Sequence, residues 1–335
     1  MQKKYHVYAI GNALVDTEIE VTDSFLEKMD LGKGMMTLVD EHRQRELVDA
    51  LEDEAKPHAW ASGGSAANTI IATSYFGGHA YYSCRVADDA TGAFYVRDLK
   101  AAGVDTNMNS QERPEGHSGK CLVLITPDAE RTMQSFLGVS AGVCEDDLDP
   151  EALRQSYFAY IEGYLAPSDT GRAAAVKMRQ LAREHGVQVA ITLSDPGIVE
   201  NFQPQLEEMI GNGVDLLFCN EAEACSFTGQ QDVEKALEEL KKVSNSVVIT
   251  RGAKGAWAWD GEKLHEVDAK PIKPVDTNGA GDMFAGAFLY AIGEGHDYGT
   301  AGKLASAACA KVISDFGPRI SEEEHLAVRK EVLGE

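Results

Sequence analysis

The chain has 335 residues, of which 44% are hydrophobic and 25% charged, and its formal net charge is −23. These values are ordinary for a soluble globular protein, and the length suits one large α/β domain or two medium ones. So negative a charge argues against nucleic acid or an anionic membrane as a partner, because both are polyanions. Solubility, for example in a salty cytoplasm, is the simplest reason for it.

No targeting segment is visible. The first apolar stretch, Tyr5–Leu14, is interrupted by His6 and Asn12 and lacks the core and cleavage site of a signal peptide. The most apolar later segment, Met283–Gly293, is too short to span a bilayer. The six cysteines form no C-x-x-C pair, which favours reduced thiols over a zinc site or redox motif. We therefore expect a cytoplasmic protein.

The segment Gly11–Asp16 follows the first strand and is the first candidate for ligand binding. The side chains of Asn12 and Asp16 can hydrogen-bond the hydroxyl groups of a polyol. An Asp at a turn after a strand is usually structural, so the motif alone does not decide between these interpretations.

Two stretches, 16–39 and 118–136, predict a small second sheet because neither lies between a parallel strand and its crossover helix. This sheet would be a lid over a site or a surface for dimerisation, and an exposed sheet edge permits a monomer or a homodimer. Its strand-like runs are Thr17–Val21, Met35–Val39, Lys120–Thr126 and Arg131–Phe136.

The segment Gly63-Gly64-Ser65-Ala66-Ala67-Asn68 follows the predicted strand His58–Ala61. Paired glycines permit a turn with positive φ and a close approach of ligand to backbone. Asn68 would lie about one helical turn further on, within reach of the same ligand. The alternative is a plain strand-to-helix turn in which Ser65 caps the helix.

From residue 55 onward, short β-branched or aromatic runs alternate with helical patterns. This alternation predicts a parallel sheet covered by helices on both faces, in one domain over residues 1–335. The predicted strands are His58–Ala61, Ala80–Cys84, Ala159–Glu162, Gln188–Thr192, Leu216–Cys219 and Ser246–Thr250. The predicted helices are Ser65–Phe76, Ala90–Ala102, Thr170–His185, Glu221–Phe227 and Val233–Val243.

The motif Asn220-Glu221-Ala222-Glu223 follows a predicted strand. Asn220 with Glu223 three residues later is typical of a capping box at a helix start. The same oxygen-bearing side chains suit a Mg²⁺–phosphate group. Both interpretations can hold together, since α/β folds bind ligands at helix starts that follow sheet strands.

The motif Thr250-Arg251-Gly252-Ala253-Lys254-Gly255 also follows a predicted strand. It favours a nucleotide-contacting loop and a simple β-turn equally.

The strongest motif is Asp276-Thr277-Asn278-Gly279-Ala280-Gly281-Asp282, which precedes the apolar helix Met283–Ile292. The two common phosphate loops, G-x-x-x-x-G-K-[ST] and G-x-G-x-x-G after a strand, are absent. Small residues at a helix start leave backbone N–H groups free to bind an anion, and the helix dipole assists them. Asp282, in the first turn beside that anion, suits a general base, although acids also favour helix starts for structural reasons.

Together these motifs resemble the PfkB/ribokinase family of carbohydrate and nucleoside kinases, from Gly11 to about Arg319. Asp276–Asp282 looks like the family's C-terminal signature, Gly63–Asn68 looks like its N-terminal signature, and Asn220–Glu223 matches its N-x-x-E motif. The resemblance implies a three-layer α/β/α ribokinase-like fold with a mainly parallel central sheet and a small β-sheet lid.

The resemblance also assigns a role to each motif residue. Asp282 would be the catalytic base, and the amides of Gly279, Ala280 and Gly281 would stabilise the transferring phosphoryl group. The acceptor would be bound by Asn12, Asp16, Gly63, Gly64, Ser65, Asn68, Tyr164 and Asp282. ATP would be bound by Asn220, Glu223, Thr250, Gly252, Gly255, Asn278, Gly279 and Gly281.

The expected cofactor is Mg²⁺ with ATP, held through water by Asn220 and Glu223. Several family members need K⁺ near the anion site, where this resemblance would place Asp276. Arg131 and Lys254 are the candidate cations for ATP, and Arg131 on the predicted hairpin would be brought in as the lid closes. The alternative for Arg131 is a solvated strand residue.

Within the family, the closest likeness is to adenosine kinases. Gly11–Asp16 is similar to their GNPLLD motif, and residues 214–223 and 191–196 look like their segments. Where those kinases show paired aromatics, this chain has Tyr164-Leu165. The expected reaction is transfer of the ATP γ-phosphoryl group to the 5′-hydroxyl of adenosine, giving AMP in purine salvage. The alternatives are a sugar kinase of ribokinase or fructokinase type, an inosine-guanosine kinase, and a non-enzymatic nucleotide-sensing interaction protein.

Overall fold

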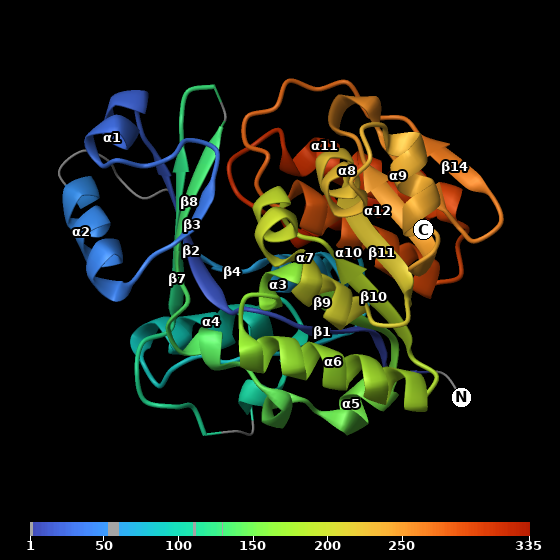
Figure 1. Cartoon of the computed structure of the whole chain (residues 1–335), viewed down its shortest axis with the longest axis horizontal. Coiled ribbons are helices and arrows are strands. Elements are labelled where there is room, and N and C mark those ends of the chain that lie inside the picture. The colour runs from blue at the N-terminus through green and yellow to red at the C-terminus, as the bar shows by residue number, and fades with distance from the viewer. Residues whose placement is uncertain (1–2, 53–59, 110–111, 129) are drawn as a thin grey trace.

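The computed structural model of the chain describes residues 3–52, 60–109, 112–128 and 130–335. It has a large α/β body and, beside it, a second sheet with two helices (Figure 1). The body has three layers, with a sheet between two layers of helices, which confirms the predicted fold class.

In the described part of the chain the central sheet has nine strands, in the order β14-β13-β12-β11-β10-β9-β1-β5-β6. All neighbours from β12 to β6 are parallel, and only the edge pairs with β13 and β14 are antiparallel. Parallel neighbours bring their carboxyl ends to one edge of the sheet, where ligands bind in such folds. The strands are β1 Tyr5–Ile10, β5 Ala80–Ser83, β6 Val104–Thr106, β9 Ser156–Glu162, β10 Gln188–Thr192, β11 Val214–Asn220, β12 Ser244–Thr250, β13 Ala256–Trp259 and β14 Leu264–Val267.

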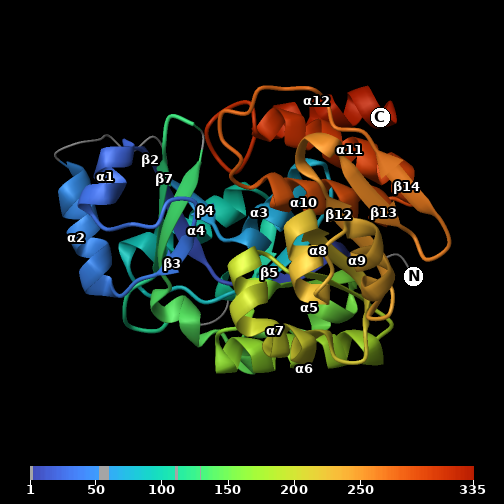
Figure 2. The same ribbon diagram turned by 45° about the horizontal axis from the view of Figure 1, so that its top comes forward.

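Side chains alternate across the sheet and make two cores. In β1, Val7 and Ala9 join one core while Tyr8 and Ile10 join the other. Figure 2 shows helices on both sides of the sheet. One layer contains α3 Ser65–Tyr75, α4 Ala90–Ala101, α10 Ala280–Gly293, α11 Tyr298–Val312 and α12 Glu322–Leu333. The other contains α5 Pro150–Arg154, α6 Asp169–Glu184, α7 Pro196–Ile210, α8 Glu221–Thr228 and α9 Val233–Leu240.

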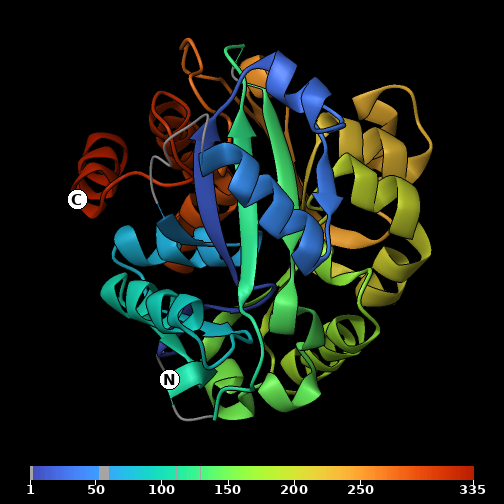
Figure 3. The same ribbon diagram turned by 90° about the vertical axis from the view of Figure 1, so that its left-hand side faces the viewer.

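The second sheet has the order β3-β8-β7-β2-β4. Its strands are β2 Leu14–Glu20, β3 Met36–Leu38, β4 Trp60–Gly63, β7 Gly119–Ile125 and β8 Arg131–Phe136. Its outer face packs Ile19, Leu122 and Leu124 against helices α1 Asp23–Lys28 and α2 Glu41–Glu52, which lie in front of the sheet in Figure 3. Because these helices cover that face, a dimer through this sheet would have to use its edges or the helices themselves.

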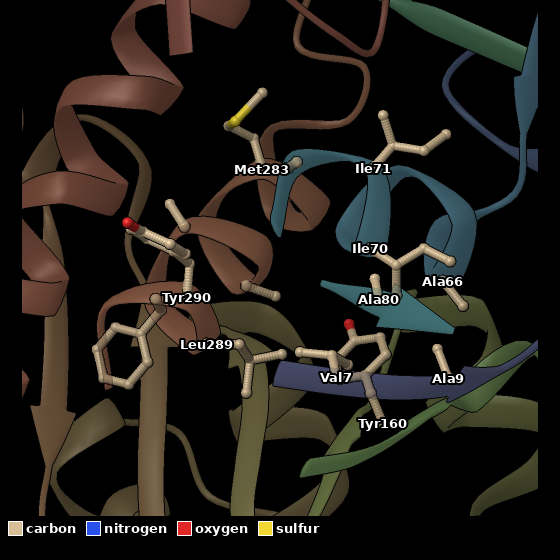
Figure 4. Close-up of a cluster of buried hydrophobic side chains, with 14 of the residues drawn as sticks. Val7, Ala9, Ala66, Ile70, Ile71, Ala80, Tyr160, Met283, Leu289 and Tyr290 are labelled. Atoms are coloured by element: carbon tan, nitrogen blue, oxygen red, sulfur yellow. The ribbon is translucent and has the colours of Figure 1, made fainter. Parts of the chain in front are cut away.

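The packing of α10 on α3 decides where the site forms. Figure 4 shows Ile70 and Ala66 of α3, with Met283 and Leu289 of α10, gathered over Val7 and Ala9 of β1. A Cβ at Gly286 would lie 2.3 Å from the Thr69 carbonyl oxygen, so only glycine permits the two helices to approach this closely. The approach brings the start of α10 to the start of α3. Burial of each side chain of the size of Ile70 contributes about 1.5–3 kcal/mol to the stability of the folded protein.

One prediction about a strand is corrected and one is confirmed. The strand predicted at His58–Ala61 for the parallel sheet is β4, which lies in the second sheet and pairs antiparallel with β2. A strand-like run this short does not indicate which other strand it pairs with. Residues 58 and 59 of the predicted strand lie outside the described residues. The predicted hairpin of 118–136 is confirmed as β7 and β8, with Ala129 of its turn outside the described residues.

The elements that the sequence did not reveal are mostly at the periphery: the edge strands, α1, α2, α5, α7, α11 and α12. All six cysteines are free thiols, as predicted. Of the helices in the described ranges, none has the length and apolar character to cross a membrane. Short 3-10 turns lie at Asn107–Asn109, Gly138–Gly142, Glu145–Asp147, Gly163–Leu165 and Gly252–Lys254.

Candidate active site

A cavity of about 550 Å³ lies between the carboxyl edge of the central sheet and the inner face of the second sheet. It brings together nearly all the predicted site residues, although they come from distant parts of the chain. Gly63 and Asp276 do not line it and lie behind its wall. The predicted residues that line it are Asn12, Asp16, Gly64, Ser65, Asn68, Arg131, Tyr164, Asn220, Glu223, Thr250, Gly252, Gly255, Asn278, Gly279, Ala280, Gly281 and Asp282.

The residues Asp276–Gly281, called the anion loop below, lead into α10. Gly279 is the N-cap with φ of 70°, and α10 begins at Ala280. A Cβ at Gly279 would meet the Pro318 carbonyl oxygen at 2.5 Å, so glycine is required by conformation and by space. The first N–H groups of the helix have no partner within it, although Ala280 N donates to Thr277 O at 3.3 Å. Gly279, Ala280 and Gly281 line the cavity, where such N–H groups can bind an anion.

The carboxylate of Asp282 lies in the first turn of α10 and is held by two donors from α3. Ser65 Oγ donates to Oδ1 at 2.7 Å, and Asn68 Nδ2 donates to Oδ2 at 3.2 Å. Burial raises the pKa of Asp282, while the two hydrogen bonds and Arg131 oppose the shift. Ser65 therefore does not cap α3, where Gly64 is the N-cap; it orients Asp282 instead.

Asp16 on β2 adds a second carboxylate to the cavity, near enough to Asp282 for the charge of Asp282 to raise its pKa. The carboxylate lies against Gly63, where a Cβ would be 1.9 Å from Oδ2, and Gly64 has φ of 96°. Burial raises the pKa of Asp16 to about 8, against the lowering effects of Arg319 and the Gly64 amide. The glycine pair thus makes room for a buried carboxylate that can accept hydrogen bonds from hydroxyl groups.

Glu162 is a site residue that the sequence analysis did not single out. It is 1% exposed at the end of β9, and its carboxylate accepts from Asn12 N at 2.6 Å, Asn12 Nδ2 at 3.0 Å and Ala66 N at 2.8 Å. It therefore ties the turn after β1 to the start of α3. Burial raises its pKa to about 7. One feature of the sequence could have indicated Glu162 as a site residue: it is an acid at the end of an apolar strand, directly before a glycine.

Asn220 and Glu223 form the predicted capping box of α8. Asn220 Oδ1 accepts from Glu223 N at 2.8 Å, while Glu223 Oε1 and Oε2 accept from Asn220 Nδ2 at 2.6 Å and Asn220 N at 3.0 Å. Burial, with Asp195 and Asp282, raises the pKa of Glu223 to about 7. Asp195, which the sequence analysis also missed, caps α7 through Gly197 N at 2.7 Å and lines the cavity.

The turn after β12 lines the far end of the cavity through Thr250, Gly252 and Gly255. Lys254 of this turn does not reach the cavity, because its Nζ binds Glu221 at 3.2 Å. A role for Lys254 as a cation for ATP stays a prediction. Lys270, on the loop that packs beside Gly255, lines the cavity and pairs with Glu331 at 2.7 Å.

Arg131 on β8 connects the second sheet to the anion loop. Its Nη1 donates to Asn278 Oδ1 at 2.9 Å, so the side chain lies over the cavity and is not a solvated strand residue. Asp276 lies behind the loop, where its two carboxylate oxygens accept from Asn278 N at 2.8 Å and Gly317 N at 3.1 Å. Asp276 is completely buried and fixes the loop conformation. A role for it in binding K⁺ stays a prediction.

Replacing Asp16 by Asn is expected to raise the melting temperature at pH 8 by roughly 3–8 °C, and by less at pH 5. The folded-state pKa of Asp16, about 8, exceeds the ordinary aspartate value of 3.8. Between these values the folded state holds a proton that the unfolded state releases, so stability falls as pH rises through this window. Asn cannot ionise and avoids that loss. Calorimetry at both pH values tests this.

The control for this variant is Asp105→Asn, which removes an exposed carboxyl group paired with Lys4 at 3.0 Å. The pKa of Asp105 is lowered, so its replacement should not stabilise the protein at pH 8. Equal melting temperatures for Asp16→Asn and the parent protein at pH 8 would show that burial of this carboxylate costs nothing.

Comparisons with known proteins find kinases among the relatives of this chain. A family model described as pfkB family carbohydrate kinase matches residues 38–325. The chain is 27% identical to adenosine kinase of Saccharomyces cerevisiae, an alignment that covers 94% of this chain and 96% of the relative.

Two solved structures are similar over almost their whole length. The crystal structure of adenosine kinase from Sinorhizobium meliloti is 32% identical, with a TM-score of 0.91, covering 98% of this chain and 99% of that one. A probable sugar kinase from Rhizobium etli is 31% identical, also with a TM-score of 0.91, covering 98% of each chain. Since one relative is named for a nucleoside and the other for a sugar, fold similarity does not choose the acceptor.

Proposed function

The chain belongs to the pfkB family of carbohydrate kinases, and on that premise we propose that it transfers the γ-phosphoryl group of ATP to the 5′-hydroxyl of adenosine. The membership makes it a phosphotransferase that acts on an alcohol group, and its relatives make it a nucleoside or sugar kinase. The product under this proposal is AMP, formed as a step of purine salvage in the cytoplasm.

The observation that carries the chemistry is the placement of Asp282 between two ligand-binding elements. Its carboxylate lies in the first turn of α10, beside the N–H groups that can hold a phosphate, and it is oriented by Ser65 and Asn68 of α3. A hydroxyl group between Asp282 and the anion loop can lose its proton to the carboxylate as it attacks the γ-phosphorus.

Charge stabilisation comes from the anion loop and from Arg131. The phosphoryl group spreads negative charge over its equatorial oxygens in the transition state, and donors held in place need no reorganisation to bind it. The N–H groups at the start of α10 supply such donors, and Arg131 supplies a cation from the second sheet. Closure of that sheet over the cavity would exclude water, which would otherwise accept the phosphoryl group.

The charges of the cavity fit a magnesium complex of ATP better than free ATP. Among the described lining residues, Arg131 and Lys270 are the only basic ones, whereas the acids are Asp16, Glu162, Asp195, Glu223 and Asp282. Mg²⁺ supplies the missing positive charge and keeps several of its waters, so it needs no cage of protein ligands. Within the described ranges no cluster of three metal-ligating side chains occurs. Asn220 and Glu223 already bond each other, which fits contact through water.

The inner face of the second sheet supports a nucleoside as acceptor. The strand register places four residues in one row across this sheet. In order along the row they are Asp16, Cys121, Ser135 and Leu38. The neighbouring rows of the same face that line the cavity add Leu14, Val123, Met133 and Met36. This face thus offers one carboxylate, that of Asp16, which can bind hydroxyl groups, and an apolar surface beside it. A planar base can pack against the apolar surface, whereas a free sugar cannot.

Tyr164 and Ile198 complete this apolar end from the central body. A purine lying between Tyr164 and the second sheet could stack on the ring of Tyr164, as offset aromatic pairs do. Tyr164 would thus take the place of the paired aromatics that the adenosine kinases show at this point of their sequence.

The proposal predicts ADP release from Mg-ATP with adenosine at least about tenfold faster, in kcat/KM, than with ribose or fructose. An apolar pocket of this kind discriminates by about 1–3 kcal/mol per group that fills it. The measurement is a coupled assay with adenosine, inosine, guanosine, ribose and fructose, in the presence of K⁺. Turnover on ribose or fructose without turnover on any nucleoside would overturn the acceptor and keep the kinase chemistry.

A further inference from the structure

Asn278 of the anion loop is contacted from the second sheet at its oxygen but not at its nitrogen. Its Oδ1 accepts from Arg131 Nη1 at 2.9 Å, and its backbone N donates to Asp276 Oδ1 at 2.8 Å. The side chain is only 7% exposed, and its Nδ2 is buried with no hydrogen-bond partner in the structure. This amide therefore has one buried donor still to satisfy.

A buried acceptor lies near the same amide. Glu18 on β2 is 4% exposed, and its Oε1 also has no hydrogen-bond partner in the structure. The Asn278 amide lies close enough to lower the pKa of Glu18, as do Arg319 and Arg131, although burial and Asp276 raise it overall. Glu18 also lies near the backbone of Gly317, which holds Asp276.

A donor and an acceptor that are both buried and unpaired in one cluster are costly, and the cost is removed when they bond to each other. We propose that Glu18 is a positioning residue that accepts a hydrogen bond from Asn278 Nδ2 when the second sheet closes on the body. Glu18 and Arg131 then hold the two ends of one amide, and closure of the second sheet fixes the anion loop against the phosphates.

This inference rests on the proposed kinase function and deepens it, because it states how the second sheet acts on the reaction. It does not require adenosine as the acceptor. The polarity of the amide makes it testable, since its oxygen is already bonded to Arg131 and only its nitrogen can face Glu18.

The first pair of variants removes or keeps the acceptor at position 18. Glu18→Leu is expected to lower kcat about tenfold with a smaller change in the KM for ATP, because the anion loop loses its orientation and not its binding groups. Glu18→Gln retains an acceptor oxygen and should stay within about threefold of the parent kcat. Equal kcat for Glu18→Leu and the parent enzyme, with only a lower melting temperature, would show a purely structural role.

The second pair reverses the polarity of the bond. Asn278→Asp places a carboxylate opposite Glu18 and is expected to lower kcat by about a hundredfold. Adding Glu18→Gln to it lets the Gln amide donate to Asp, and should recover at least about tenfold. The matched control adds Glu27→Gln, which makes the same charge change on exposed α1 and should recover nothing. The proposed contact would be overturned if Glu18→Gln and Glu27→Gln restored the kcat of Asn278→Asp equally. It would also be overturned if neither of them restored it.

The readouts separate this inference from the choice of acceptor. The kcat of each of these variants is measured with whichever acceptor the parent enzyme phosphorylates. In parallel, the rise in melting temperature that Mg-ATP alone causes is measured for each of them. Activity on a sugar only would overturn adenosine as the substrate without affecting the pairing of Glu18 and Asn278. Loss of the rescue in both readouts would overturn the pairing whatever the substrate is.

Discussion

Replacing Asp282 by Asn is expected to lower kcat about 10³–10⁴-fold while the KM for ATP changes by less than about threefold. The Asn side chain has almost the same shape and can still accept the hydrogen bond from Ser65, which at present spans 2.7 Å. It cannot accept a proton from the attacking hydroxyl group. The loss should therefore appear in the chemical step, measured by steady-state kinetics and confirmed by nucleotide binding to the variant.

The pH dependence gives a second view of the same residue. Burial raises the pKa of Asp282 above the ordinary range of aspartates, and the base must be ionised to act. The kcat of the parent enzyme should fall as pH decreases through that pKa, and the residual activity of Asp282→Asn should lack this limb.

The matched control is Asp297→Asn. Asp297 caps α11 through Gly299 and Thr300, as another acid at a helix start outside the cavity. Because Asn caps helices about as well as Asp, Asp297→Asn should cost at most about 1 kcal/mol of stability, through the lost charge at the helix dipole, and no activity. If Asp282→Asn kept the parent kcat, Asp282 would not be the base and the proposed chemistry would be wrong.

The parts of the fold that could be predicted from the sequence are those with local signals. The buried strands of the central sheet are short apolar runs, and the start of α10 is marked by Gly279 and its neighbours because glycine there has a positive φ. The parallel arrangement follows from strand and helix alternation. In contrast, β4 was assigned to the wrong sheet, because pairing with β2 is a tertiary choice that four residues do not reveal.

The parts of the site that were missed depend on contacts between distant elements. Glu162 acts on Asn12 and Ala66, which are 150 and 96 residues away in the sequence. Glu18 lies in a strand where an acid usually faces solvent, and only burial against the anion loop distinguishes it. The position of Lys254 beside glycines suggested a contact with ATP, whereas in the structure it pairs with Glu221 and does not line the cavity.

Gly279→Ala is expected to lower kcat about 10²–10³-fold, the range found when one donor of an anion-stabilising site is lost. Gly279 has φ of 70°, and its added Cβ would lie 2.5 Å from Pro318 O and 2.7 Å from Pro318 Cα. These are backbone atoms and cannot move aside as the end of a flexible side chain does. The loop must therefore change conformation, and its N–H groups no longer point at the phosphoryl group.

Two other glycines separate the causes of this loss. Gly295 has φ of 90° with nothing within 4 Å of an added Cβ, so Gly295→Ala introduces backbone strain alone and should lower the melting temperature without affecting kcat. Gly281 also has free space but lines the cavity, so Gly281→Ala should raise the KM for ATP with little loss of stability. If Gly279→Ala retained kcat within about threefold of the parent, the left-handed turn would be a folding requirement only, and the anion loop would not stabilise the transferring group.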